Sequence, residues 1–265
     1  MAVRIAAYAR IAPEGVLGRG ARPFAHSWRE FSPDAPDAFG LPPLKARYFL
    51  DEPFPKYGRM DPLCKVAVAA ALLAFRAGDG LPGLNRDEMA QAGGTMLGCL
   101  EVDAQFEATR LAGQPSPGLF VYTLPSMFQG ETAILLRLRG QASLNAAGAL
   151  SGLAALSSGA RLVQQGRAAS VLVVAADAAG PAAARAMGAA PFSGACAWVL
   201  APQGELGGIA GVSYEPTPGA VALPRGPWPF ALSFLHGLEE HMAAPSRATL
   251  CAEADGQAVC LQVEP

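Results

Sequence analysis

The side chains that could attack an acyl group are three serines on one predicted helix and a cysteine beside a glycine turn. These are Ser151, Ser157, Ser158 and Cys99. A serine attacks only when a base activates it, and the three histidines of the chain are distant from these serines in sequence. No Gly-x-Ser-x-Gly elbow occurs, which disfavours a serine hydrolase, although the sequence leaves a triad assembled in space open. Cys99 is expected to be a buried structural thiol.

Cofactor sites are not indicated either. Five acidic residues fall on predicted helix faces without a histidine or cysteine at ligand spacing, so we expect them to face solvent: Glu101, Asp103, Glu107, Glu239 and Glu240. The glycine pairs at 93–94 and 207–208 lack the spacing and the downstream acid of a dinucleotide site. The sequence therefore predicts no metal and no nucleotide cofactor.

The five cysteines are widely spaced and odd in number, which is more typical of reduced, buried thiols than of a disulfide framework or a zinc site. They are Cys64, Cys99, Cys196, Cys251 and Cys260. Residues 1–7 are apolar but too few for the core of a signal peptide, and no apolar run reaches the length of a membrane span. A cytoplasmic location without a membrane span is expected.

Composition points to one compact domain. The 265 residues are 51% hydrophobic and 16% charged, which is enough to bury a single large core. The formal net charge of −2 comes with scattered Lys and Arg, so no basic stripe suits a phosphate backbone and nucleic acid is not an expected partner.

Strands and helices are predicted to alternate, which favours a parallel or mixed sheet covered on both faces. Asp61-Pro62 should open a long helix, whereas residues 13–62 read mainly as a connecting loop. Asp255-Gly256 should turn a hairpin. Further helices are expected at 101–111, 126–137 and 149–165, one short helix follows 229, and strands are expected at 3–11, 90–96, 142–147, 170–176, 195–200, 207–213, 247–252 and 257–263.

The segment Gly140–Arg161 joins a nearly uncharged strand, expected to be buried on both faces, to a helix that begins with almost no side-chain bulk. A junction of this kind can hold a nucleophile at a helix N-terminus, where unpaired N–H groups and the helix dipole favour an anion. Here no nucleophile occupies it. Taken alone, the segment is equally typical of an Ala-rich helix that packs closely on its neighbours.

The order of several such segments resembles the β-ketoacyl synthases. Leu138-Arg139-Gly140, the small-residue junction and Ser151-Gly152 are similar to the family's nucleophile region, and Ala149 falls where the family has its cysteine. The resemblance extends over residues 1–215, in order, and these further segments carry it: Arg59-Met60-Asp61 with its helix, the turn at Gly94–Gly98, Tyr122-Thr123-Leu124-Pro125, and Pro191-Phe192-Ser193 with Gly194–Leu200.

The resemblance implies an α/β fold: a thiolase-like, layered α-β-α half with a five-stranded mixed sheet. Residues 1–215 would form the ketosynthase N-terminal-like domain, and residues 216–265 a reduced extension of one short helix and two strands on the same domain. The family's supporting histidines belong to a second half that is mostly absent here. His236-Gly237 is superficially similar to one of those motifs, but it opens a predicted helix, so His236 and His241 are expected at the surface or as helix caps.

Loss of the cysteine at Ala149 implies a non-catalytic, chain-length-factor-like subunit. Such a chain would pair with an active ketosynthase in fatty-acid-like, polyketide or aryl-polyene biosynthesis and shape its acyl tunnel, with an acyl carrier protein as a further candidate partner. The strand 142–147 would join the two subunits. Side chains expected near the acyl tunnel and the interface are Leu119, Phe120, Tyr122, Met127, Phe128 and Leu144. Ordinary core packing is the alternative for this cluster.

Two other functions stay open at this point. One is an acyltransferase or decarboxylase whose active site a partner completes, and the other is a homodimeric structural scaffold. Ala149 argues against covalent acylation. A reduced second half argues against a self-sufficient homodimer, because its exposed apolar face would need cover.

Overall fold

The computed structural model describes residues 3–32, 34–243 and 246–265. Within them the strands form one eleven-stranded sheet, in which the main order is β5-β4-β6-β7-β1-β8-β11-β10-β9, and β2 and β3 extend from β1. The strands are β1 (Val3–Ala12), β2 (Gly15–Arg19), β3 (Phe24–His26), β4 (Ala90–Gly94), β5 (Ala142–Asn145), β6 (Val171–Ala179), β7 (Phe192–Ala201), β8 (Gly208–Ser213), β9 (Val221–Ala222), β10 (Ala248–Ala254) and β11 (Gln257–Glu264).

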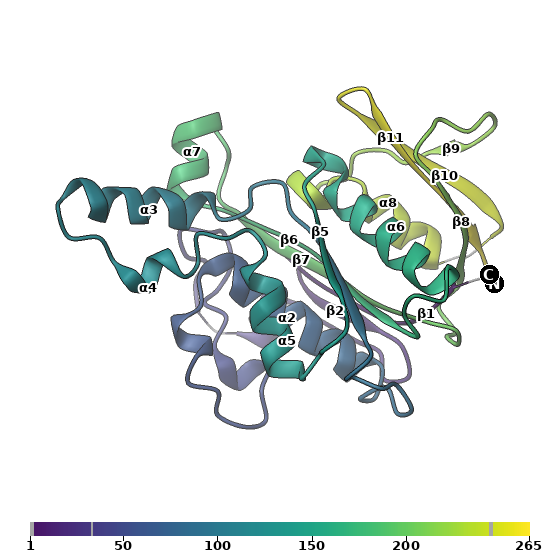
Figure 1. Ribbon diagram of the computed structural model, residues 1–265, viewed down its shortest axis with the longest axis horizontal. Helices are drawn as coiled ribbons and strands as arrows, with labels where there is room; N and C mark the ends of the chain where they lie inside the picture. Colours follow the sequence, from purple (N-terminus) through teal and green to yellow (C-terminus); the bar gives the residue numbers. More distant parts are fainter. Residues whose placement is uncertain (1–2, 33, 244–245) are drawn as a thin grey trace.

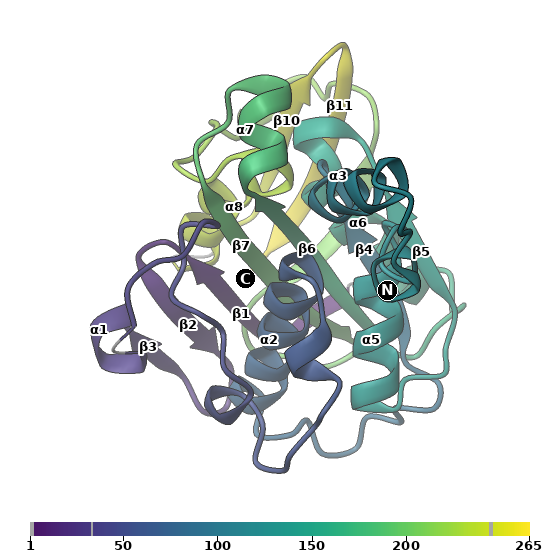
Figure 2. The same ribbon diagram turned by 90° about the vertical axis from the view of Figure 1, so that its left-hand side faces the viewer.

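Helices cover both faces of this sheet. Helices α2 and α5 lie on one face and α6 and α8 on the other, while α3, α4 and α7 gather at one end (Figures 1 and 2). The α-helices are α1 (Trp28–Phe31), α2 (Pro62–Ala77), α3 (Leu100–Leu111), α4 (Pro117–Phe120), α5 (Met127–Leu136), α6 (Ser151–Gln164), α7 (Pro181–Met187) and α8 (Leu235–Ala243). Short 3-10 helices are η1 (Ala46–Tyr48), η2 (Tyr57–Arg59), η3 (Gly148–Leu150) and η4 (Phe230–Leu232).

Strand β6 shows how the two layers of the core are built. Every residue of β6 is buried, and successive side chains alternate between the faces. Val171, Val173 and Ala175 pack with α6 and the C-terminal segment. Leu172, Val174 and Ala176 pack with α2 and α5. An unbroken apolar run without polar alternation is what a strand covered on both sides requires.

The mixed sheet is confirmed, but the expected five strands were wrong. Parallel pairing is confined to β4 with β5 and β6, and to β9 with β10. The additional strands arise because β1 shares one edge between two partners: β8 pairs near its start and β2 near its end. The hairpin of β10 and β11 then continues the sheet from β8.

The segment 13–62 is mainly irregular, as expected, but it also contains short elements that were not predicted: β2, β3, α1, η1 and η2. Helix α2 starts as predicted: the Asp61 side chain accepts a hydrogen bond from Cys64 N at 2.8 Å, and Pro62 occupies the first turn. The short helices α4 and α7 were not predicted. The Asp255-Gly256 turn is confirmed, with φ of 53° and 76° at its two residues, as a type I′ hairpin turn needs.

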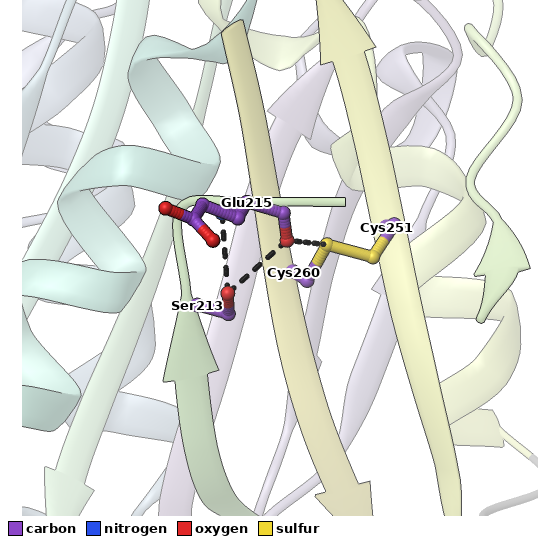
Figure 3. Close-up of a disulfide and its surroundings, with 4 residues drawn as sticks. All are labelled: Ser213, Glu215, Cys251 and Cys260. Atoms are coloured by element: carbon purple, nitrogen blue, oxygen red, sulfur yellow. Dashed lines mark hydrogen bonds between the residues drawn. A yellow bond between two sulfur atoms is a disulfide. The ribbon is translucent and has the colours of Figure 1, made fainter. Parts of the chain in front are cut away.

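The cysteines depart from the predicted set of reduced thiols. Cys251 and Cys260 face each other in the register of β10 and β11, with Cα atoms 4.1 Å apart, and form a disulfide. Figure 3 shows the Cys260 sulfur beside the carbonyl oxygen of Glu215, at 3.4 Å. Cys64, Cys99 and Cys196 are free and buried. The pair was missed because the number of cysteines and their spacing along the sequence do not show which residues a hairpin register places opposite each other.

Candidate functional site

Ala149 lies at a tightly packed junction between sheet and helix. The chain leaves β5, passes through η3, which contains Ala149, and enters α6 at Ser151. Ala149 is 8% exposed. Glycines on both sides keep the backbones close: a Cβ at Gly94 would collide with the carbonyl oxygen of Ser151, and a Cβ at Gly152 with that of Ala231. The absence of bulk in this segment is therefore a packing requirement.

Two serines of α6 make hydrogen bonds within the chain, and the third makes none among the described residues. Ser151 Oγ accepts a hydrogen bond from Ala147 N at 2.9 Å and donates one to Gly148 O at 2.7 Å, so it closes the turn that precedes its own helix. Ser158 Oγ donates to Asn145 Oδ1 at 2.9 Å. Ser157 is buried, and its hydroxyl has no hydrogen-bond partner within the described residues. None of these arrangements resembles a hydroxyl held by a base.

Asp177, which the sequence analysis did not single out, organises the loops around this junction. Its carboxylate is completely buried at the end of β6. Oδ1 accepts from Thr95 Oγ1 at 2.7 Å and from Leu97 N at 2.8 Å. Oδ2 accepts from Ala231 N at 2.9 Å, and Met96 N lies 3.1 Å from both oxygens. Burial raises the pKa of Asp177, and these hydrogen bonds act in the opposite direction.

A hollow of about 500 Å³ opens beside Ala149. Phe230, on its wall, has a φ of 58°, a strained conformation for a bulky side chain that the bond from Ala231 N to Asp177 helps to hold. The described residues that line this hollow include Arg225, Ser233 and Asp255 but no cysteine and no histidine. The Ser233 hydroxyl donates to the Phe230 carbonyl oxygen at 2.7 Å. The hollow offers no evident nucleophile for acyl transfer.

His236 and His241 do not line the hollow beside Ala149. His236, on α8, packs edge-on against Trp228 with ring centroids 5.0 Å apart and lies 3.7 Å from Glu240. His241 Nε2 is 2.9 Å from the carbonyl oxygen of Ser246. Both contacts are local to α8 and its flanking segments.

Two of the acidic residues expected to face solvent are instead buried. Glu101 accepts three backbone hydrogen bonds at the start of α7, from Gly180, Ala182 and Ala183, at 2.8–2.9 Å. Glu239 accepts from the Tyr8 hydroxyl at 3.1 Å. The helix-face argument failed because distant segments pack on these helices: the start of α7 contacts Glu101, and β1 contacts Glu239.

A second hollow, of about 740 Å³, lies among the N-terminus of α2, α3, α4 and the start of α5. Leu119 and Tyr122 line it together with Glu131. Glu131 is buried, and the sequence analysis did not single it out. The Tyr122 hydroxyl donates to Glu131 Oε1 at 3.0 Å. Burial and the neighbouring Glu131 raise the pKa of Tyr122, so this hydroxyl keeps its proton.

The other predicted interface residues do not line this second hollow. Phe120 is 61% exposed and packs against Phe106 with ring centroids 5.4 Å apart. Met127 is partly buried, and Phe128 is fully buried in the core of the chain itself. Leu144 is half-buried on β5. The expectation that this strand is buried on both faces was wrong, since β5 forms the edge of the sheet and its first two residues are exposed.

Within the described residues, no helix is long and apolar enough to cross a membrane. The same part of the chain holds no group of three or more His, Cys, Asp or Glu side chains arranged to bind a metal ion.

Residues 45–195, more than half of the chain and including Ala149, match the model of the β-ketoacyl synthase N-terminal domain. The chain belongs to the β-ketoacyl synthase family. No functionally curated protein matches the chain.

Solved structures of this family share the fold. The ishigamide ketosynthase/chain length factor aligns with a TM-score of 0.71 and 19% identity, covering 99% of both chains. The type II PKS complex AntDE:AntF, an acyl-carrier protein with its ketosynthase, gives 0.73 and 13% identity with the same coverage. The ketosynthase ApeO with its chain length factor ApeC from Xenorhabdus doucetiae gives 0.62 and 18% identity, again covering 99% of both chains.

Proposed function

We propose that this chain is a non-catalytic, chain-length-factor-like subunit that pairs with an active ketosynthase and shapes its acyl tunnel in fatty-acid-like, polyketide or aryl-polyene biosynthesis. The observation that carries the proposal is Ala149, which we place, by the resemblance of its flanking residues, at the position where the family has its nucleophilic cysteine. Under this assignment, the chain keeps the tight packing at the start of α6 and lacks the attacking sulfur atom.

The sheet edge supports the association. Strand β5 pairs only with β4 within the described residues, so one of its edges is left without a strand partner. An unpaired edge with exposed Ala142 and Ser143 and no charge of its own has little to deter pairing with another chain. Exposed apolar side chains lie nearby along the chain, on and after α4: Phe120, Val121 and Leu124. Such an edge and patch suit a second subunit better than solvent.

Structures with a TM-score above 0.6 include chains described as a chain length factor or as a ketosynthase with its carrier protein. We therefore propose an active ketosynthase as the partner, an acyl carrier protein as a further one, and a cytoplasmic location. Leu119, Phe120, Tyr122, Met127, Phe128 and Leu144 remain the proposed tunnel and interface set.

Coexpression tests the pairing directly. The chain and the ketosynthase of its own pathway should copurify as a one-to-one heterodimer by size-exclusion chromatography. The isolated chain, incubated with an acyl carrier substrate, should show no stoichiometric acyl adduct by mass spectrometry. An adduct would favour the partner-completed acyltransferase, a stable homodimer would favour the scaffold, and a chain that stays monomeric beside its ketosynthase would refute the pairing.

A further inference from the structure

We propose that Cys251 and Cys260 form a reversible redox pair, and that its oxidation fixes the C-terminal hairpin against the junction at Ala149. The inference rests on the proposed function only for the cytoplasmic location, because the pair itself belongs to β10 and β11. In a reducing compartment a protein disulfide is usually transient and catalytic or redox-sensing. A disulfide in a chain of that compartment therefore points to redox sensing.

The two sulfur atoms lie on the face of the hairpin that points away from α6. Leu250 and Ala252, which flank Cys251 in β10, belong to the core that contains α6, and successive side chains of a strand alternate between its faces. Cys251 is 8% exposed, whereas Cys260 is 1% exposed. We therefore assign the first contact with a small disulfide to Cys251, which is reached without opening the core.

The fold accommodates both oxidation states. Without the S–S bond, β10 still pairs with β11 and β9, and β11 still pairs with β8. The Cys260 thiol would also have an acceptor at hand, because its sulfur lies 3.4 Å from the carbonyl oxygen of Glu215 (Figure 3). Reduction therefore removes one covalent link from a hairpin that its strand pairing and core contacts continue to hold.

The oxidant that the exchange needs is a small-molecule disulfide, such as glutathione disulfide. The Cys251 thiolate attacks one of its sulfur atoms, which forms a mixed disulfide and releases one glutathione. The Cys260 thiolate then attacks the Cys251 sulfur, which forms the protein disulfide and releases the second glutathione. The protein loses two electrons and two protons, and glutathione disulfide gains both. Excess glutathione reverses the same two steps.

The hairpin connects this pair to the junction. Its turn residue Asp255 lines the hollow beside Ala149, and a Cβ at Gly148 would lie 3.4 Å from Asp255 Oδ2. Strand β10 also contacts η3, which contains Ala149. A cross-link restricts the opened hairpin and so makes local opening rarer. Oxidation should therefore hold this wall of the hollow in place, and reduction should let it open more often.

The first test equilibrates the purified full-length chain with about 5 mM total glutathione, at ratios of reduced to oxidised form from about 1:1 to about 1000:1. The chain is then denatured with N-ethylmaleimide, and its free thiols are counted by intact mass spectrometry. We expect two thiols to appear together within this range, in addition to those of Cys64, Cys99 and Cys196. A pair that stays oxidised throughout would be structural, and a pair that never oxidises would be no sensor; either result overturns the proposal.

The second test measures the effect on the junction by hydrogen exchange and mass spectrometry. Amides of β10, β11 and η3 should exchange at least about fivefold faster in the reduced chain than in the oxidised chain. Amides of α2, on the other face of the sheet, should exchange equally in both. A change confined to the hairpin would refute the coupling to Ala149.

Variants assign the response to its residues. The double variant Cys251→Ser/Cys260→Ser should exchange like the reduced wild type and should no longer respond to glutathione. Cys99→Ser replaces one of the free, buried cysteines and should keep the wild-type response. A response that persists in the double variant would place the redox pair elsewhere and refute the assignment.

These outcomes are separable from those of the pairing experiment. A chain that copurifies with its ketosynthase but stays oxidised in every buffer would retain the proposed function and lose the switch. A chain that responds to glutathione but never pairs would keep the switch and lose the proposed function.

Discussion

The junction at Ala149 and the exposed segments β5 and α4 belong to one chain but are built in opposite ways. At the junction, Gly94 and Gly152 let backbones touch and Ser151 is fully buried. At the edge, Phe120 and Leu124 are 61% and 58% exposed. The first region is closely packed and polar groups there are paired within the chain, whereas the second leaves apolar side chains exposed to solvent. The contrast is what the proposed non-catalytic subunit would need: a rigid core and an apolar surface for a partner.

The strongest test of the packed region is Asp177→Asn. Both carboxylate oxygens accept backbone N–H groups, so either orientation of the amide directs its NH2 group at a donor. We expect the free energy of unfolding to fall by about 3 kcal/mol, measured by urea denaturation. Asp103→Asn, at an exposed position of α3, is the matched control and should change stability by no more than about 0.5 kcal/mol. A loss below about 1 kcal/mol for Asp177→Asn would show that the carboxylate does not hold the junction together.

The open region is tested next by Leu144→Lys on β5. A lysine there would introduce a charge into a contact that becomes desolvated when the partner binds, so the complex with the ketosynthase should weaken by at least about tenfold. Leu144→Met conserves the volume and should bind like the wild type. Surface plasmon resonance gives the affinities, and thermal melting of the isolated variants separates loss of binding from loss of fold. Undiminished binding by a folded Leu144→Lys chain would exclude β5 as the interface.

Phe120→Ala should have a smaller effect, because the side chain is largely exposed in the isolated chain. Stability should change by less than about 0.5 kcal/mol and the complex should persist. If Phe120 reaches the tunnel as proposed, the product profile of the heterodimer should shift toward longer chains, as resolved by liquid chromatography and mass spectrometry. Leu111→Ala, an exposed apolar residue at the end of α3, serves as the control and should leave the product profile unchanged. An unchanged profile for Phe120→Ala would remove this residue from the tunnel set.

The smallest effect is expected from Ala149→Cys. The new thiol would stand where the family has its cysteine, but no histidine lines the adjacent hollow among the described residues. Condensation of malonyl units by the isolated variant should therefore stay at background in a radiolabel incorporation assay. Measurable turnover would mean that the remaining catalytic groups are present after all.

What the sequence predicted correctly depended on local signals. The Asp61-Pro62 cap placed the start of α2, the unbroken apolar run placed β6, and Asp255-Gly256 placed the last hairpin. These features depend on residues adjacent to one another in the chain, and local patterns are most informative there.

What it missed depended on distant partners. Asp177 follows an apolar run like any strand end, but its donors lie 54 and about 80 residues away. The carboxyl of Glu131 is buried only because Tyr122 and the neighbouring helices fold over it. Similarly, no pattern within β5 could show that it would be the edge of the sheet, since that depends on the order of strands β4, β6 and β7. Long-range pairing decided each of these features.

The way in which the last segment closes over α6 has a consequence for biosynthesis of the chain. Leu235, Leu250 and Leu261 belong to the same core as Leu153 and Leu156 of α6 and Val3 of β1. A nascent chain that has reached residue 215 therefore still presents the apolar face of α6 and an unpaired edge of β8 to solvent. We expect this part of the core to form only after β11 has left the ribosome, since contacts between segments far apart in the sequence form late and slowly. A partner or chaperone that shields α6 during that interval would determine how much of the protein reaches its folded state.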